Sequence, residues 1–241
     1  MDARSSGDGY HRARLLLDRI RGDFQRIAWI GLEHEFYFTD GQAQAWQQVL
    51  ARYRRVLRTE AGGLVEIVPE RGRGQHELVF PPACDIEFIA QLHSWAMSAF
   101  LSVADRLGVP VSFRSRPFQD RLGSSLQVSI SLRDEADTPT FYRPPSHKRG
   151  DAEILRTVNG MLATAHPLMT AFAPTPNCYQ RYQRLIFEDE LFSPATLSWG
   201  YGNRSAAILI PWAGGTPNKA RVEHRLPGAA ADPGTAISAV L

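Results

Sequence analysis

Residues 31–38 read as one β-strand that carries two carboxylates on the same face. The segment is Gly-Leu-Glu-His-Glu-Phe-Tyr-Phe. Side chains alternate along a strand, so Glu33 and Glu35 share one face while His34 and Phe36 share the other, where His34 should pack or hydrogen-bond. At an effective dielectric constant of about 20 and a separation of roughly 6–7 Å, the two carboxylates repel by about 2.5 kcal/mol. This face is therefore either exposed to solvent or bound to a cation.

Helical and strand patterns alternate along the chain without an internal repeat. Helices are expected at 10–26, 42–59, 86–107, 152–172, interrupted or bent near Pro167, and 230–241. Strands are expected at 27–38, 64–68, 77–80, 109–113, 126–132, 207–210 and 220–226. The polar residues 1–9 should be disordered. Pro81-Pro82 should end a strand, and Asp85 should cap the helix after it.

Composition limits the class of protein without naming its chemistry. The chain has 241 residues, 44% of them hydrophobic, which suits one large domain or two small ones. Its net charge of +2 gives no argument for a nucleic-acid partner. No apolar run could span a membrane, and the basic helix at 10–26 is better suited to packing on a core. Cys84 and Cys178 show neither metal-ligand nor disulfide spacing, so a reduced, cytoplasmic protein is expected.

Five glutamates lie in or beside expected strands, although acidic residues usually lie on solvated helices and loops. They are Glu33, Glu35, Glu70, Glu77 and Glu223. If the strands form one curved sheet, these carboxylates could converge, and they would then need divalent cations. Oxygen ligands favour Mg²⁺ or Mn²⁺. Four arginines could lie around them and bind phosphate oxygens or a substrate carboxylate: Arg181, Arg204, Arg221 and Arg225. Metal ions together with arginines are typical of sites for phosphoryl transfer.

The order of these motifs resembles the catalytic domain of the glutamine synthetase family. The matching residues are Glu33-His34-Glu35-Phe36, Glu70 with Gly74-Gln75-His76-Glu77, Arg116-Pro117 through Gly123-Ser124 to Ser131-Leu132, Asn177-Cys178-Tyr179-Gln180-Arg181, Asn203-Arg204-Ser205-Ala206 and Arg221-Val222-Glu223-His224-Arg225. The resemblance covers nearly all of the chain from Trp29 onward. It implies an α+β fold, a curved and mostly antiparallel sheet with flanking helices. Residues 27–241 would be the catalytic domain, after an N-terminal tail and helix at 1–26.

The resemblance also implies a role for each matching residue. Glu35, Glu70 and Glu77 would hold a metal near the substrate carboxylate, and Glu33 and Glu223 a metal that bridges the nucleotide phosphates. Gln127 stands where the family has a metal-binding histidine. Arg181 would bind the substrate carboxylate, Arg225 would make a second substrate contact, and Gly123 would lie where the substrate approaches. Arg204 and Arg221 would contact phosphate, and Ser131 would bind the nucleotide. Glu190 or Glu188 would be the acidic residue of the ammonia site.

The implied reaction is an ATP-dependent ligation. The γ-carboxylate of glutamate, or a related carboxylate, attacks ATP to give an acyl phosphate, and ammonia or an amine then displaces phosphate. The chain departs from the family at Ser129, Leu122, Ser125 and Leu209, where the last replaces an arginine that would meet the transferring phosphate. Too few residues precede the acidic strand for the family's N-terminal β-grasp domain, and the chain ends before the family's C-terminal helices.

Three hypotheses stay open at this point. The first is a carboxylate–amine ligase, with ammonia or another amine as acceptor. The second is a catalytically reduced relative that binds metal, nucleotide or a protein partner. The third is a chain that depends on a homo-oligomer or on a partner that supplies the missing domain.

Overall fold

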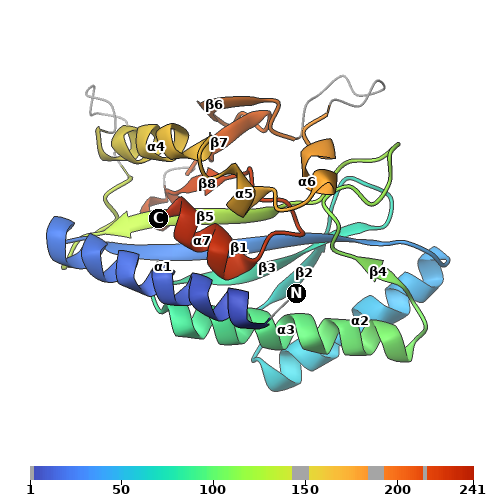
Figure 1. Cartoon of the computed structure of the whole chain (residues 1–241). Helices are drawn as coiled ribbons and strands as arrows, with labels where there is room; N and C mark the ends of the chain where they lie inside the picture. The colour runs from blue at the N-terminus through green and yellow to red at the C-terminus, as the bar shows by residue number, and fades with distance from the viewer. Residues whose placement is uncertain (1–2, 143–151, 184–192, 214–215) are drawn as a thin grey trace.

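The computed structural model describes residues 3–142, 152–183, 193–213 and 216–241 (Figure 1). Its strands form one sheet in the order β2-β3-β1-β5-β8-β7-β6, and β4 also pairs with β1. The strands are β1 (Ile27–Phe38), β2 (Glu66–Pro69), β3 (Gln75–Ala83), β4 (Val111–Ser112), β5 (Leu126–Arg133), β6 (Thr196–Tyr201), β7 (Ala206–Ile210) and β8 (Val222–His224). All pairings are antiparallel except β6 with β7. This confirms the expected mixed fold with a mostly antiparallel sheet.

Helices flank this sheet (Figure 1). They are α1 (Ala3–Phe24), α2 (Ala43–Glu60), α3 (Ile86–Arg106), α4 (Ala152–Ala165), α5 (Met169–Phe172), α6 (Pro176–Gln180) and α7 (Pro233–Val240), with a 3₁₀ turn η1 (Pro217–Lys219). No helix among the described residues is both long and apolar enough to cross a membrane. Asp85 caps α3 as expected, because its carboxylate accepts the backbone N–H groups of Glu87 and Phe88.

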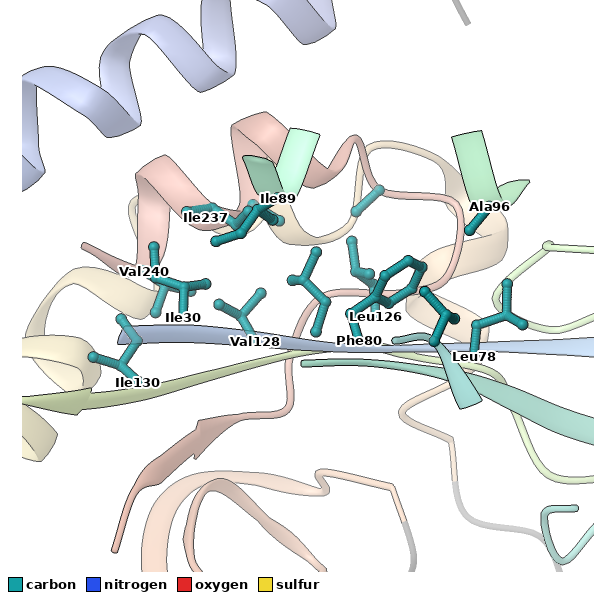
Figure 2. Packing of buried hydrophobic residues seen from close by; sticks show 14 of the residues in the cluster. Ile30, Leu78, Phe80, Ile89, Ala96, Leu126, Val128, Ile130, Ile237 and Val240 are labelled. Carbon is teal, nitrogen blue, oxygen red and sulfur yellow. The ribbon is translucent and has the colours of Figure 1, made fainter. Parts of the chain in front are cut away.

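The apolar face of the central strands carries the core. Ile30, Val128 and Phe80, from three neighbouring strands, point toward α3 and α7, where Ile89 and Ile237 meet them (Figure 2). Farther along the sheet, α4 contacts β6, β7 and β8. Each large side chain that is fully buried here contributes roughly 1.5–3 kcal/mol. The helices therefore fix which face of β1 is buried under them, and the acidic face is turned the other way.

Strand β1 is central because it pairs with β3 on one side and β5 on the other. In these registers Glu35 lies opposite Glu77, and Glu33 lies opposite Gln127. On the next strand, Glu223 lies opposite Ser129 of β5. Directly opposite residues of antiparallel strands have Cβ atoms about 5 Å apart and share a face. The sheet register alone thus gathers polar side chains from four strands.

The N-terminal segment differs from expectation. Residues 1–9 were expected to be disordered, but α1 already begins at Ala3. Gly9 in this helix is buried, and a Cβ atom there would collide with the backbone of Gly234 and Thr235. The absence of a side chain lets α1 lie directly on α7. Tertiary packing against the other end of the chain, which composition does not reveal, extends the helix.

Three other elements, β3, α6 and β6, differ from expectation. Strand β3 continues through Pro81-Pro82, because β2 pairs with it only as far as Val79 and the register with β1 is irregular between Ile30 and Leu32. The helix expected at 152–172 is interrupted near Pro167, as expected, and forms α4 and α5. Helix α6 and strand β6 were not anticipated.

Candidate active site

The acidic face of the sheet opens into one cavity of about 280 Å³. All five glutamates that the sequence singled out line this cavity, together with Arg204, Arg221 and Arg225. The full lining is Glu33, Glu35, Glu70, Arg71, Gln75, Glu77, Leu122, Gly123, Gln127, Ser193, Arg204, Leu209, Pro211, Arg221, Glu223 and Arg225. Glu35 and Glu77 are only 8% and 9% exposed, so the alternative of a solvated acidic strand face is wrong.

Glu35 is held by hydrogen bonds from neutral donors. Its Oε1 atom accepts from Ser125 Oγ at 2.5 Å and from Gln127 Nε2 at 3.1 Å. Its Oε2 atom accepts from the Ser125 backbone N at 2.9 Å and from Gln75 Nε2 at 3.2 Å. Four donors fix the orientation of this carboxylate, although none of them cancels its charge.

Glu77 is the least compensated carboxylate of the cavity. Its Oε2 atom is buried and has no hydrogen-bond partner among the described residues. Burial, followed by repulsion from Glu33, Glu35 and other carboxylates, raises the pKa of Glu77 from 4.5 to about 9. Burial and Glu223 likewise raise the pKa of Glu33 to about 7, although Arg221 and Arg225 oppose that rise. This side of the cavity is therefore short of positive charge.

Glu223 is compensated by arginine. Its Oε1 atom accepts from Arg221 Nη2 at 2.6 Å and Nε at 3.1 Å, and its Oε2 atom lies 4.0 Å from Arg225 Nη1. The same Nη1 atom donates to Gln127 Oε1 at 2.6 Å. Gln127 thus connects Arg225 to Glu35, and both ends of its amide have protein partners. Arg225 therefore contacts both a glutamate and a glutamine of the cavity wall.

Arg181 lies behind the cavity wall and is almost fully buried. Its Nη2 atom donates to the carbonyl oxygen of Arg225, and its Nη1 atom has no hydrogen-bond partner in the described part of the chain. The stem of Arg181 packs on Gly123, where a Cβ atom would clash with it. A buried guanidinium with a free donor suits a carboxylate ligand, as the resemblance implies.

Two other expected site residues are not gathered here. Ser131 lies on β5 on the same face as Gln127, but it does not line the cavity. Glu190 and its alternative Glu188 lie outside the described residues. The cavity also contains Arg71, Gln75 and other residues that the sequence reasoning had not selected. Gln75 could have been found, because strand alternation puts it on the same face as Glu77.

The histidine of the acidic strand points away from the cavity, as expected. His34 Nδ1 lies 3.0 Å from His93 Nε2, and His34 Nε2 lies 2.9 Å from the carbonyl oxygen of Ala229. Burial lowers the pKa of His34 to about 4, so the ring is neutral near pH 7. This histidine supports the core and the segment before α7.

The donor set suits a hard cation at one part of the cavity. Among the described residues, no three His, Cys, Asp or Glu side chains are closely enough grouped to form a ready metal site. The unpartnered Oε2 atom of Glu77 lies in a cavity lined by other carboxylates, and it fits an oxygen-binding cation such as Mg²⁺. Gln127 and Glu223 do not fit as well, because arginines already occupy their oxygens.

Comparisons with known proteins agree with this architecture. The family model described as glutamine synthetase, catalytic domain, matches residues 30–241. The chain belongs to the glutamine synthetase family. A glutamine synthetase of Pyrococcus woesei is 31% identical over 175 residues, which are 71% of this chain and 36% of that protein. A glutamate–isopropylamine ligase of a Pseudomonas species is 28% identical over 199 residues, 80% of this chain and 40% of that protein.

Solved structures show the same glutamine synthetase fold. A crystal structure described as a novel glutamine synthase homologue has a TM-score of 0.78 at 23% identity, covering 96% of this chain and 57% of the other. The Plasmodium falciparum glutamine synthetase has a TM-score of 0.76 at 17% identity, covering 96% of this chain and 54% of the other. The chain spans at most about 40% of the length of the two curated relatives it matches here.

Proposed function

We propose that this chain is the catalytic domain of an ATP-dependent carboxylate–amine ligase. The observation that carries the proposal is the convergence of five glutamates and three arginines from distant parts of the sequence on one cavity. The substrate would be glutamate or a related carboxylate, and the acceptor ammonia or an amine. The names of the relatives, which include a glutamate–isopropylamine ligase, support an acceptor other than ammonia as readily as ammonia itself.

The first step would be transfer of the terminal phosphoryl group of ATP. An oxygen of the γ-carboxylate attacks the γ-phosphorus, the bond from that phosphorus to the bridging oxygen breaks, and ADP leaves with γ-glutamyl phosphate as the other product. Catalysis of such a step depends mainly on positioning and on charge neutralisation. Arg204 and Arg221, which line the cavity with their charged groups, would hold phosphate oxygens.

The carboxylates would hold the divalent cation, Mg²⁺ or Mn²⁺. Glu77 has the free buried oxygen, and Glu33, Glu35 and Glu70 line the same cavity. When bound, such an ion neutralises charge on the phosphate groups and orients them. Glu35, which Ser125 and Gln127 already orient, would keep its geometry whether or not the ion is present.

The second step would form the amide. The amine nitrogen attacks the carbonyl carbon of the acyl phosphate, the carbon–oxygen bond to phosphate breaks, and a proton from the nitrogen passes to a base. Arg225, which lines the cavity, and Arg181, whose buried Nη1 atom has no partner among the described residues, would hold the substrate through its other carboxylate. The assignment of Glu190 as the acidic residue of this step stays a prediction.

An assay of ADP release tests the proposal. The protein is given Mg²⁺, ATP and glutamate with a panel containing ammonia, isopropylamine and putrescine, and ADP and the amide are both measured. We expect amine-dependent ADP release that falls by at least about 100-fold in Glu77→Gln. Glu66→Gln, which alters an exposed carboxylate on β2, is the matched control and should retain activity.

The alternative function is binding without turnover. Leu209 replaces an arginine of the family, and Gln127 is engaged by Arg225 and Glu35, which favours a catalytically reduced relative. Binding of Mg²⁺ and ATP in calorimetry, with no ADP release on any amine, would contradict the ligase and support this second reading. The assay should be repeated at several protein concentrations, since dependence on self-association or on a partner would appear there.

A further inference from the structure

The two ends of the cavity differ in how their negative charge is compensated. At one end, called here the arginine end, Glu223 lies with Arg221, Arg225 and Gln127. At the other, called the glutamate end, Glu77 lies opposite Glu35 in the sheet and lines the cavity with Glu70. The resemblance to the family implied one metal at each end, and the contacts in this chain distinguish the two ends sharply.

At the arginine end, the oxygens of Glu223 and Gln127 already have arginine neighbours. Glu223 Oε1 accepts two N–H groups of Arg221, at 2.6 and 3.1 Å. Arg225 Nη1 lies between Glu223 Oε2, at 4.0 Å, and Gln127 Oε1, at 2.6 Å. Two guanidinium groups thus supply the positive charge that a divalent ion would otherwise bring, and they would repel such an ion.

Gln127 completes this arrangement. Its amide nitrogen donates to Glu35 Oε1 at 3.1 Å while its oxygen accepts from Arg225. Only the oxygen of an amide can ligate a metal ion, so a cation at this position would have to displace the guanidinium of Arg225. A neutral amide offers little compensation for that loss.

At the glutamate end, no arginine among the described residues is hydrogen-bonded to Glu77 Oε2. Glu77 is more than nine-tenths buried, its Oε2 atom has no partner among the described residues, and it lines the cavity. A buried carboxylate oxygen without a donor is unfavourable and is normally explained by an unseen ion or water. The neighbouring carboxylates add further acceptor oxygens of the kind that Mg²⁺ and Mn²⁺ prefer.

We propose that this chain binds a single divalent cation, at Glu77, and that Arg225 and Gln127 replace the cation at the end beside Glu223. The inference rests on the proposed function in assuming that the cavity binds metal. The inference goes beyond the proposed function because it specifies how many ions bind and which residues hold them. The arginine end would then meet phosphate oxygens directly, through N–H donors of Arg221.

Mn²⁺ binding in the absence of nucleotide tests how many divalent cations each chain binds. The metal-stripped chain is titrated with Mn²⁺, and free Mn²⁺ is followed by its electron paramagnetic resonance signal. Omitting ATP matters, because the nucleotide would bring its own ion. We expect one Mn²⁺ per chain. Two ions per chain would overturn the inference and leave the proposed ligase intact. If no Mn²⁺ bound, the inference would be overturned, and the proposed site would hold no cation in the absence of nucleotide. The assay of ADP release would still test the ligase activity independently.

Matched variants locate the ion. Glu77→Gln and Glu223→Gln make the same chemical change at opposite ends of the cavity. We expect the first to weaken Mn²⁺ binding by about 100-fold and the second by less than about threefold. Gln127→Ala should also keep one ion at nearly unchanged affinity, and a large loss in this variant would show that Gln127 is a ligand and refute the inference. Glu70→Gln, with circular dichroism as the check of folding, is a second probe of the glutamate end and should also weaken Mn²⁺ binding.

Discussion

Replacing Glu77 with glutamine removes a carboxyl group that the metal-free fold holds in its protonated form near pH 7. The side chain keeps its shape, and the unpartnered Oε2 atom becomes either an amide N–H donor toward the neighbouring carboxylates or a neutral oxygen. We therefore expect Glu77→Gln to stabilise the metal-free protein near pH 7. A substitution at a buried polar position usually destabilises, so the direction of this effect is diagnostic.

The magnitude follows from the pKa of Glu77. In the folded chain it is about 9, against 4.5 in its usual state. At pH 7 the folded carboxyl keeps a proton that the unfolded chain has lost, which costs about 3 kcal/mol in free energy of unfolding. Since Glu33 shares the titration and the amide is itself buried, we expect a net gain of about 2 kcal/mol, or roughly 4–8 °C in Tm.

Unfolding with a chelator present, measured from pH 5 to pH 9, provides the assay. Because the folded pKa lies above the unfolded one, wild-type stability should fall as pH rises through this window, and the slope should be shallower in Glu77→Gln. Mn²⁺ at 100 times its dissociation constant should add about 2.7 kcal/mol to the wild type and almost nothing to the variant. A variant that is less stable than wild type in the chelator, while Glu66→Gln is unchanged, would refute the reasoning.

Three further predictions concern packing, capping and nucleotide binding. Gly9→Ala should cost about 1–3 kcal/mol because its Cβ atom meets the α7 backbone, whereas Gly7→Ala, with nothing within 4 Å, should stabilise slightly in thermal melts. Asp85→Ala should cost about 1 kcal/mol of unfolding free energy through loss of the α3 cap, and no change would contradict that role. Arg221→Gln should weaken ATP binding about tenfold in calorimetry. The control is Arg58→Gln, at an exposed position of α2, and a contact between Arg221 and phosphate would be excluded if both variants bound ATP with the same affinity.

The sequence predicted those helices and strands that are defined by the alternation or spacing of apolar residues within the segment itself. Residues 27–38 form β1 with the expected bounds, and the strictly alternating segment at 126–132 is β5. It did not predict β6, because this edge strand is largely exposed and exists through parallel pairing with β7. The helical start of the chain was also hidden, since it depends on Gly9 meeting α7 more than 220 residues later. Contacts between distant segments decided each of these cases.

The sequence predicted which carboxylates line the candidate site, and it did not predict which side chains are hydrogen-bonded to one another there. Residue type and strand alternation were enough to select Glu33, Glu35 and Glu77, which line one cavity. The partner of Gln127 was beyond reach, because Arg225 lies 98 residues further along the chain. Which carboxylates are neutralised by arginine, and which are left for a cation, depends on such pairings.

Strand β1 couples the stability of the fold to the geometry of the site. Its apolar face is fixed under α3 and α7, and side chains on a strand alternate with a period of two. A slip of one residue would put Glu33 and Glu35 under the helices and His34 and Phe36 into the cavity. The cost of burying two carboxylates without partners prevents that slip. The core therefore holds Glu35 opposite Glu77 despite their repulsion, and burial on one face of β1 offsets the charge concentrated on the other.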